Sequence, residues 1–195
     1  MRLTDRRVVT PSAEPTDAFP AWLASARAGD AAGFAALYDW LGPEVKRFAI
    51  GRGARDPEAV VNDTFVAAFR RLGEFDGDAA GFRSWIYAIV RNRLIDAHRA
   101  EQRRPGLADG DGVEPESTAS AEDIALAGLG FGRASELLAS LTDAQRDVIL
   151  CRVVNALTLE ETADAVRRPV TAVKRLQARA LSQLRQKISD EGVSS

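Results

Sequence analysis

Apolar residues recur at helical spacing along two long stretches of the chain, and no stretch of useful length alternates apolar and polar residues as a strand does. One such helical face runs through Val61, Phe65, Phe69 and Leu72, and the same spacing continues downstream. Stripes of this kind bury one side of a helix against a core. The sequence therefore predicts an all-α fold, although the stripes alone indicate packing and not function.

A change in composition divides this helical chain in two. Residues 105–132 contain six acidic residues together with glycine, proline and serine, but no lysine or arginine. Low hydrophobicity with one sign of charge cannot offset the entropy of ordering, so we predict a flexible acidic linker there. The polar, proline-bearing residues 1–18 are predicted to be a disordered tail. Two small helical domains are expected, at 19–104 and 133–190.

Several helix starts are marked by residues that can cap free backbone N–H groups. Asp56 precedes a proline at the first helical position, Pro57. Thr142 and Thr158 are each followed three residues later by Gln or Glu, which fits a capping box. We therefore expect helices to begin directly after these three capping positions.

The segment 157–185 has the layout of a helix-turn-helix: a capped helix over 158–166, a short turn at Arg167-Arg168-Pro169, and a longer second helix. In such motifs the second helix enters the major groove of DNA, and its first turns face base edges. The outward positions predicted to contact bases are Thr171, Lys174, Arg175, Ala178 and Arg179, whereas Arg167, Arg168 and Arg185 are better placed for phosphates. The alternative is a solvated basic helix end. The motif alone does not distinguish a repressor from another DNA-binding protein.

A second basic segment, residues 75–105, interleaves aromatic rings with arginines. Its aromatic residues are Phe75, Phe82, Trp85 and Tyr87, and its arginines include Arg83, Arg91, Arg93, Arg99, Arg103 and Arg104. Single-stranded nucleic acid binds such surfaces because bases stack on rings, at roughly 1–3 kcal/mol per base, while cations follow the backbone. Gly77 and Gly81 could shape a loop over an extruded base. The alternative is that Trp85 is a core residue of an amphipathic helix whose exposed face carries basic residues.

Two stretches resemble conserved regions of one protein family. "NDTFVAAFRRLGEFDGDAAGFRSWIYAIVRNRLIDAHR" is similar to the second region of bacterial extracytoplasmic-function sigma factors of the sigma-70 family. "LTDAQRDVILCRVVNALTLEETADAVRRPVTAVKRLQARALSQLR" is similar to their fourth region. The resemblance implies two helical domains of an alternative sigma factor. Such a protein binds core RNA polymerase, recognises the −35 and −10 promoter elements and promotes promoter melting.

The resemblance also implies roles for individual residues. Core polymerase would bind the helix after Asp56 through the clamp helices of its largest subunit, and the second domain through the flap of its second-largest subunit. The implied polymerase-binding residues are Asn62, Asp63, Arg70 and Arg71. The implied −10 residues are Phe75, Asp76, Phe82, Arg83, Trp85, Arg91, Asn92, Arg93 and Arg99. The implied −35 residues are Arg167, Arg168, Thr171, Lys174, Arg175, Ala178 and Arg179.

The sequence departs from the family pattern at several of these places. Ala59 and Asn62 replace a usual Asp and Gln on the docking helix, and Arg167 replaces the usual turn glycine. The acidic linker would run through polymerase channels, either as a mimic of nucleic acid or as a simple tether. The family is commonly held inactive by an anti-sigma factor, which the resemblance implies as a further partner.

Composition argues against an enzyme. The chain has one cysteine, Cys151, and one histidine, His98, which leaves almost no material for a disulfide, a zinc site or a His-based triad. It has no phosphate-cradling glycine loop, and we expect no cofactor. A stand-alone helix-turn-helix repressor or activator is the main alternative, and a helical scaffold would leave the basic patches unexplained.

Without a signal-peptide pattern or a ~20-residue apolar run, we expect a bacterial cytoplasmic protein, associated with the nucleoid in the holoenzyme.

Overall fold

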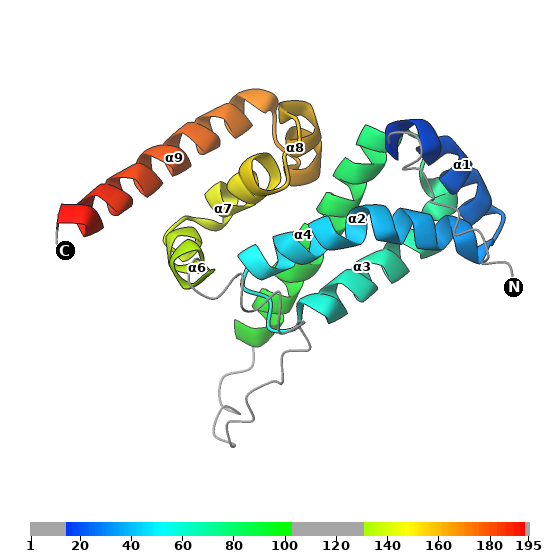
Figure 1. Cartoon of the computed structure of the whole chain (residues 1–195), viewed down its shortest axis with the longest axis horizontal. Coiled ribbons are helices and arrows are strands. Elements are labelled where there is room, and N and C mark those ends of the chain that lie inside the picture. Colours follow the sequence, from blue (N-terminus) through cyan, green and yellow to red (C-terminus); the bar gives the residue numbers. More distant parts are fainter. Residues whose placement is uncertain (1–14, 103–130, 194–195) are drawn as a thin grey trace, which may run out of the picture.

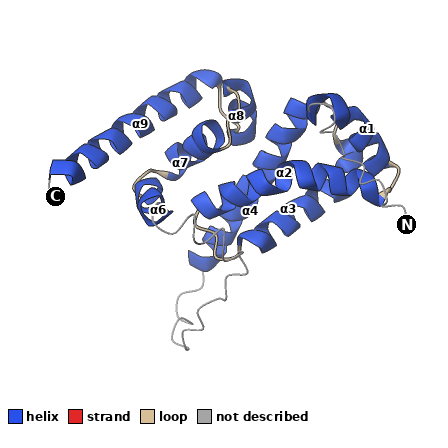
Figure 2. Ribbon diagram, in the orientation of Figure 1, coloured by secondary structure: helices blue, strands red, loops and turns tan. Residues whose placement is uncertain are grey.

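The computed structural model describes residues 15–102 and 131–193, and every regular element in these two ranges is helical (Figure 1; Figure 2). The all-α prediction is therefore confirmed. The predicted linker, 105–132, and most of the predicted tail, 1–18, lie outside the described residues. None of the described helices is both long and apolar enough to cross a membrane.

The first lobe is built from four helices and one short turn. They are α1 (Pro15–Arg27), α2 (Ala31–Gly51), α3 (Pro57–Arg70), the 3-10 turn η1 (Leu72–Glu74) and α4 (Ala79–Gln102). Helix α1 begins at Pro15, ahead of the onset predicted near Phe19. The cap predicted at Asp56 is confirmed, because its carboxylate accepts a hydrogen bond from the Ala59 N–H at 2.9 Å.

The second lobe contains the predicted helix-turn-helix. Its elements are α6 (Phe131–Ala139), α7 (Asp143–Ile149), the π-helical turn η2 (Leu150–Val154), α8 (Leu159–Val166) and α9 (Val170–Val193). Both predicted capping boxes are confirmed, with Thr142 before α7 and Thr158 before α8. Each box satisfies backbone N–H groups that would otherwise have no partner at the start of a short helix.

The two lobes pack directly against each other, which the sequence did not predict. Helix α8 lies against α4, and Figure 1 shows the second lobe beside this helix. Four buried residues of the second lobe belong to the same apolar cluster as the core of α1–α4: Leu150, Cys151, Leu157 and Ala165. The second lobe also has smaller clusters of its own, around Val148 and Val173 and around Ile149 and Ala180. The structure is thus a closed arrangement of two helical lobes.

Candidate nucleic-acid interface

A sharp turn between α8 and α9 sets the direction of the second helix of the motif. Arg167 adopts a left-handed conformation there, with φ 52° and ψ 52°. The following N–H, of Arg168, donates to the Ala163 carbonyl at 2.9 Å and closes the end of α8. This left-handed conformation costs a non-glycine residue roughly 1–2 kcal/mol, so the turn is strained as well as sharp.

Helix α9 presents one basic face to solvent. Its opposite side is anchored in the lobe by Val173 and Ala180, both fully buried. All seven residues predicted to bind the −35 element are exposed: Arg167, Arg168, Thr171, Lys174, Arg175, Ala178 and Arg179. No acidic residue occurs between Asp164 and Asp190 to neutralise this face. Helical spacing was therefore sufficient to predict that these positions are exposed, and their contact with bases and phosphates of a duplex stays a prediction.

The aromatic residues of the 75–85 segment lie mostly in a cluster of rings. The ring centroids of Phe75 and Phe82 are 5.3 Å apart, as are those of Phe75 and Trp85 and those of Phe19 and Phe82. Phe82 has no exposed surface, whereas Phe75 and Trp85 are half-buried. The predicted contact of Phe82 with DNA needs correction: its ring is a core group that supports the loop and cannot stack on a base in this arrangement.

The loop from Phe75 to Asp78 is held at both ends. Arg27 of α1 donates a hydrogen bond to the Phe75 carbonyl, and Asp78 Oδ1 accepts one from the Gly81 N–H at 2.8 Å. A Cβ at Gly77 would lie 2.8 Å from Phe75 Cζ, so glycine is required for this close approach. Sequence reasoning missed Arg27, which lies 48 residues from Phe75 and carries no local signal of this role.

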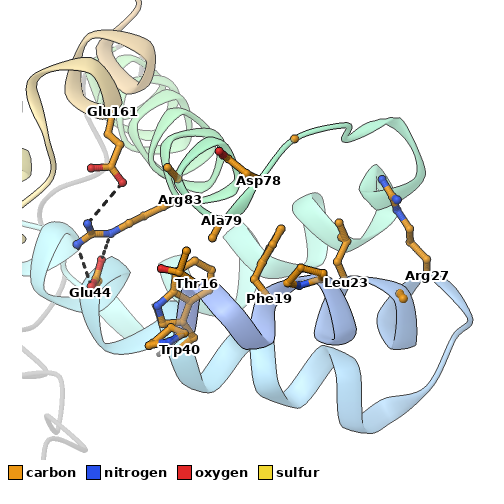
Figure 3. Close-up of a pocket in the computed structure, with 15 residues that line it drawn as sticks. Thr16, Phe19, Leu23, Arg27, Trp40, Glu44, Asp78, Ala79, Arg83 and Glu161 are labelled. Atoms are coloured by element: carbon orange, nitrogen blue, oxygen red, sulfur yellow. Dashed lines mark hydrogen bonds and ion pairs between the residues drawn. The ribbon is translucent and has the colours of Figure 1, made fainter. Parts of the chain in front are cut away.

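Two hollows flank this loop. One, of about 610 Å³, lies among α1, α2 and the start of α4, and Figure 3 shows Glu44 and Glu161 beside the guanidinium group of Arg83 at its edge. Two carboxylates beside one guanidinium group leave little room for a phosphate in this arrangement. The other, of about 700 Å³, is lined by residues that include Arg27, Phe34, Phe69, Leu72, Phe75 and Asp76. Its apolar rings and polar edge suit a planar base.

Arg83, predicted to bind −10 DNA, is engaged by carboxylates instead. It forms a two-pronged pair with Glu44, at 2.9 and 3.0 Å, and lies 3.6 Å from Glu161 of the second lobe (Figure 3). Burial alone would lower the pKa of Arg83, but the hydrogen bonds and charge of Glu44 outweigh it, and the pKa is raised above its ordinary value. The guanidinium therefore stays charged and points toward protein rather than solvent.

Arg91 is engaged in the same way. Its Nε donates to Asp147 Oδ2 at 2.7 Å, and Asp147 is a buried residue of the second lobe. Both Arg83 and Arg91, which the sequence predicted to bind −10 DNA, thus face the second lobe in the closed arrangement. The physical reason is that a guanidinium fork fits a carboxylate as well as it fits a phosphate.

The remaining residues predicted for the −10 element are at least partly accessible. Asp76 and Arg99 are exposed, while Asn92 and Arg93 are half-buried. Arg93 lies 3.4 Å from Asp63 of α3, and Arg99 lies 3.8 Å from Asp96 of its own helix. Both of these ion pairs are exposed and are therefore easily exchanged for other anions.

One face of α3 carries the residues predicted to bind polymerase. Asn62, Asp63 and Arg70 are exposed on the helix, and Arg71 is exposed at its end. Val66 lies one turn from both Asn62 and Arg70 and is 47% exposed. Sequence reasoning missed Val66, although its spacing from Asn62 and Arg70 was a usable signal. The strip combines polar groups with one apolar side chain, as the surface of a protein–protein contact often does.

The described residues offer no metal site and no reactive thiol. Within 15–102 and 131–193, no group of three or more His, Cys, Asp or Glu side chains could hold a metal ion. Cys151 is buried, and this burial raises the pKa of its thiol well above the ordinary value. The neutral form is therefore favoured, which suits a core group better than a nucleophile.

Comparisons with known proteins agree with this division into two lobes. The family profile "Sigma-70 region 2" matches residues 37–104, and "Sigma-70, region 4" matches residues 137–186. The chain is 29% identical over 169 residues to ECF RNA polymerase sigma factor BldN of Streptomyces coelicolor, which covers 85% of the chain and 64% of BldN. It is 32% identical over 177 residues to ECF RNA polymerase sigma factor RpoE of Cereibacter sphaeroides, covering 86% and 95% of the two proteins.

A solved structure has a similar fold. The structure of CnrH in complex with the cytosolic domain of CnrY matches this chain with a TM-score of 0.69 at 26% sequence identity. The match covers 89% of this chain and 99% of that one. The similarity therefore extends over both lobes.

Proposed function

Because the chain belongs to the extracytoplasmic-function group of sigma-70 family RNA polymerase sigma factors, we propose that it binds core RNA polymerase, recognises a two-part promoter and promotes its melting. The first lobe, α1–α4, is its region 2, and the second lobe, α6–α9, is its region 4. The observation that carries the proposal is the exposed basic surface of α9 and the turn before it, where every residue predicted to contact the −35 element is accessible.

Region 4 reads the upstream duplex in this proposal. The first turns of α9 enter the major groove, where Lys174, Arg175 and Arg179 donate to base edges. Arg167 and Arg168, in the turn before the helix, contact phosphates and fix the register without reading sequence. The turn supports this role, because it leaves Arg167 and Arg168 exposed at the start of the helix.

Region 2 holds the opened −10 strand. The hollow beside Phe75, with rings as its floor and Arg27 and Asp76 at its edge, accepts a base that has left the duplex. Extruding a base costs a few kcal/mol, so a hollow that is already formed favours opening at that point. Phe75 lines this hollow and Trp85 stacks on Phe75, with ring centroids 5.3 Å apart, while Asn92, Arg93 and Arg99 follow the backbone of the strand.

Polymerase binds the exposed strip of α3. Asn62, Asp63, Arg70 and Arg71 provide the polar contacts to the clamp helices of the largest subunit, and Val66 provides an apolar one. Region 4 meets the flap of the second-largest subunit. The polymerase performs the chemistry, and this chain performs no covalent step and needs no cofactor. Its place of action is the cytoplasm, on the nucleoid within the holoenzyme.

An anti-sigma factor is the proposed regulatory partner. The match to CnrH, which was solved together with the cytosolic domain of CnrY, supports this proposal. A protein that covers either lobe would block polymerase binding or DNA binding.

The test is transcription in vitro with core RNA polymerase and a library of promoter fragments. The chain should direct initiation at a subset that shares two elements, and the transcripts would identify both. Arg175→Ala should reduce transcription while the complex with core polymerase still forms. Tight binding of the chain alone to a palindromic duplex, without any polymerase-dependent transcript, would favour a stand-alone repressor instead.

A further inference from the structure

Helices α2 and α3 pack against each other in region 2, and two polar pairs link their accessible edges (Figure 1). Lys46 of α2 pairs with Glu58 near the start of α3 at 2.5 Å. Further along the same contact, the hydroxyl group of Tyr38 donates a hydrogen bond to Asn62 Oδ1 at 3.2 Å. Asn62 is one of the residues proposed to bind polymerase, so this hydrogen bond connects a residue of α2 to the polymerase-binding strip of α3.

The ring of Tyr38 has little freedom to move. Its centroid lies 4.8 Å from that of Phe65, a buried residue of the core, with 50° between the ring planes. A Cβ on Gly42, one turn along α2, would lie 3.4 Å from Tyr38 Cε1, so the backbone of Gly42 also borders the ring. Because the ring is held by these contacts, the position of its hydroxyl oxygen is held as well.

Asn62, in contrast, is exposed, and its side chain would occupy several rotamers without a partner. Its amide group has an oxygen that accepts hydrogen bonds and an NH2 group that donates two. The hydrogen bond from Tyr38 uses the oxygen and does not engage the NH2 group. Tyr38 therefore holds the amide in one orientation, in which the NH2 group is available to a binding partner.

The NH2 group belongs to a stripe along α3. Asn62, Val66 and Arg70 are all exposed and follow one another at intervals of four residues, so they share one face of the helix. The eight residues from Asn62 to Arg70 span about 12 Å. The stripe thus has hydrogen-bond donors at both ends and an apolar side chain between them. A complementary surface has oxygen acceptors at the same separation and an apolar contact between them.

We propose that Tyr38 is a positioning residue for polymerase binding: it orients the Asn62 amide so that the NH2 group donates to an oxygen acceptor on core polymerase. The acceptor is a carboxylate or a backbone carbonyl. This inference rests on the proposed docking of α3, and it adds a residue of α2 to that surface. Tyr38 acts through Asn62 and needs no contact of its own with the partner.

The expected size of the effect follows from the cost of ordering a side chain on binding. A partner that must immobilise a freely rotating side chain binds about three- to tenfold more weakly than one that meets it already in place. Tyr38→Phe removes only the hydroxyl group and keeps the ring against Phe65. It should therefore weaken the complex with core polymerase by about three- to tenfold, while Tm falls by at most about 4 °C.

The test is a double-mutant cycle of affinities for core RNA polymerase, measured by fluorescence anisotropy with the full-length chain labelled at its amino terminus. The cycle compares the wild type, Tyr38→Phe, Asn62→Ala and the double variant. When Asn62 is already alanine, Tyr38→Phe should change the affinity by less than about twofold. A purely structural role of Tyr38 would weaken binding by the same factor in both backgrounds, and that result would overturn the proposal.

Asn62→Asp identifies the part of the amide that meets the partner. Aspartate has nearly the same size and can still accept from Tyr38, but it has no NH2 group to donate. Its affinity for core polymerase should fall at least about tenfold, further than that of Tyr38→Phe. Unchanged or tighter binding would mean that the partner presents a donor, which contradicts the proposal.

Tyr87→Phe is the matched control, because it removes the hydroxyl group of the other tyrosine in the chain. Tyr87 has no exposed surface, and its hydroxyl group donates to Glu44 of α2 at 3.2 Å. This variant should bind core polymerase as the wild type does, and equal losses from the two tyrosine variants would count against a specific role of Tyr38. If the wild-type chain does not bind core polymerase at all, the proposed function itself fails. If it binds and the cycle shows no coupling, only the role of Tyr38 fails.

Discussion

Replacing Asp147 with alanine should destabilise the folded chain far more than replacing Asp63, although each carboxylate pairs with an arginine of α4. Asp147 has 1% of its side chain exposed, and Arg91 Nε donates to it at 2.7 Å. Asp63 is 70% exposed and lies 3.4 Å from Arg93. The two pairs therefore have similar chemistry but very different access to water, which makes Asp63→Ala a matched control.

The expected magnitudes follow from this difference in burial. Removing one partner of a buried ion pair costs about 3–5 kcal/mol, because a buried charge is left behind. Arg52 retains Asp143, and Arg91 is partly accessible to water, so we expect about 3 kcal/mol for Asp147→Ala. An exposed pair contributes about 0.2–1 kcal/mol. For a chain of this size, 1 kcal/mol shifts Tm by about 2–4 °C, which predicts a loss of roughly 6–12 °C against at most about 4 °C.

The assay is thermal and urea unfolding followed by circular dichroism at 222 nm, on the wild type, Asp147→Ala, Arg91→Ala and the double variant. The cycle should give a coupling free energy of about 1–3 kcal/mol between Asp147 and Arg91. A coupling below about 0.5 kcal/mol, or equal losses for Asp147→Ala and Asp63→Ala, would mean that the lobes are not held together by this pair in solution.

Three further predictions concern single residues. Arg167→Gly should raise the stability of region 4 by about 1 kcal/mol in urea unfolding, because glycine adopts the left-handed turn without strain, while weakening binding to duplex DNA through the lost cation. Thr158→Ala should lower stability by about 1 kcal/mol, since α8 loses the side chain that accepts from the Glu161 N–H. Burial raises the pKa of the Cys151 thiol, so on raising the pH the unfolded chain loses this proton before the folded chain does. The free energy of unfolding should therefore fall as pH rises above about 8.5, by up to about 1.4 kcal/mol per pH unit. Cys151→Ala should lose that part of the pH dependence.

Local features of the fold were predictable because short-range interactions determine them. The caps at Asp56, Thr142 and Thr158 involve residues at most three positions apart, and the sequence pattern contains both partners. The basic face of α9 follows in the same way from helical spacing within one element. The packing of the lobes depends on pairs such as Arg91 and Asp147, 56 residues apart, for which spacing gives no information.

The error at Phe82 has a different origin. Interleaved aromatic and basic residues show that a helix has both kinds of side chain, but not which rings face the core. Phe82 lies in the first turn of α4, where rings from α1 and α2 converge: Phe19 at 5.3 Å and Trp40 at 6.3 Å between centroids. A ring surrounded in this way is core, while Phe75, on the loop before the helix, keeps an accessible side.

Arg83 and Arg91 show why a sequence signal for anion binding does not identify the anion. Arginines that are placed to follow a phosphate backbone are equally suited to carboxylates, and in this chain region 4 supplies the carboxylates of Asp147 and Glu161. The side chains that spacing alone predicts to meet DNA therefore hold the two lobes together in this arrangement, because their nearest anions are carboxylates of the same chain.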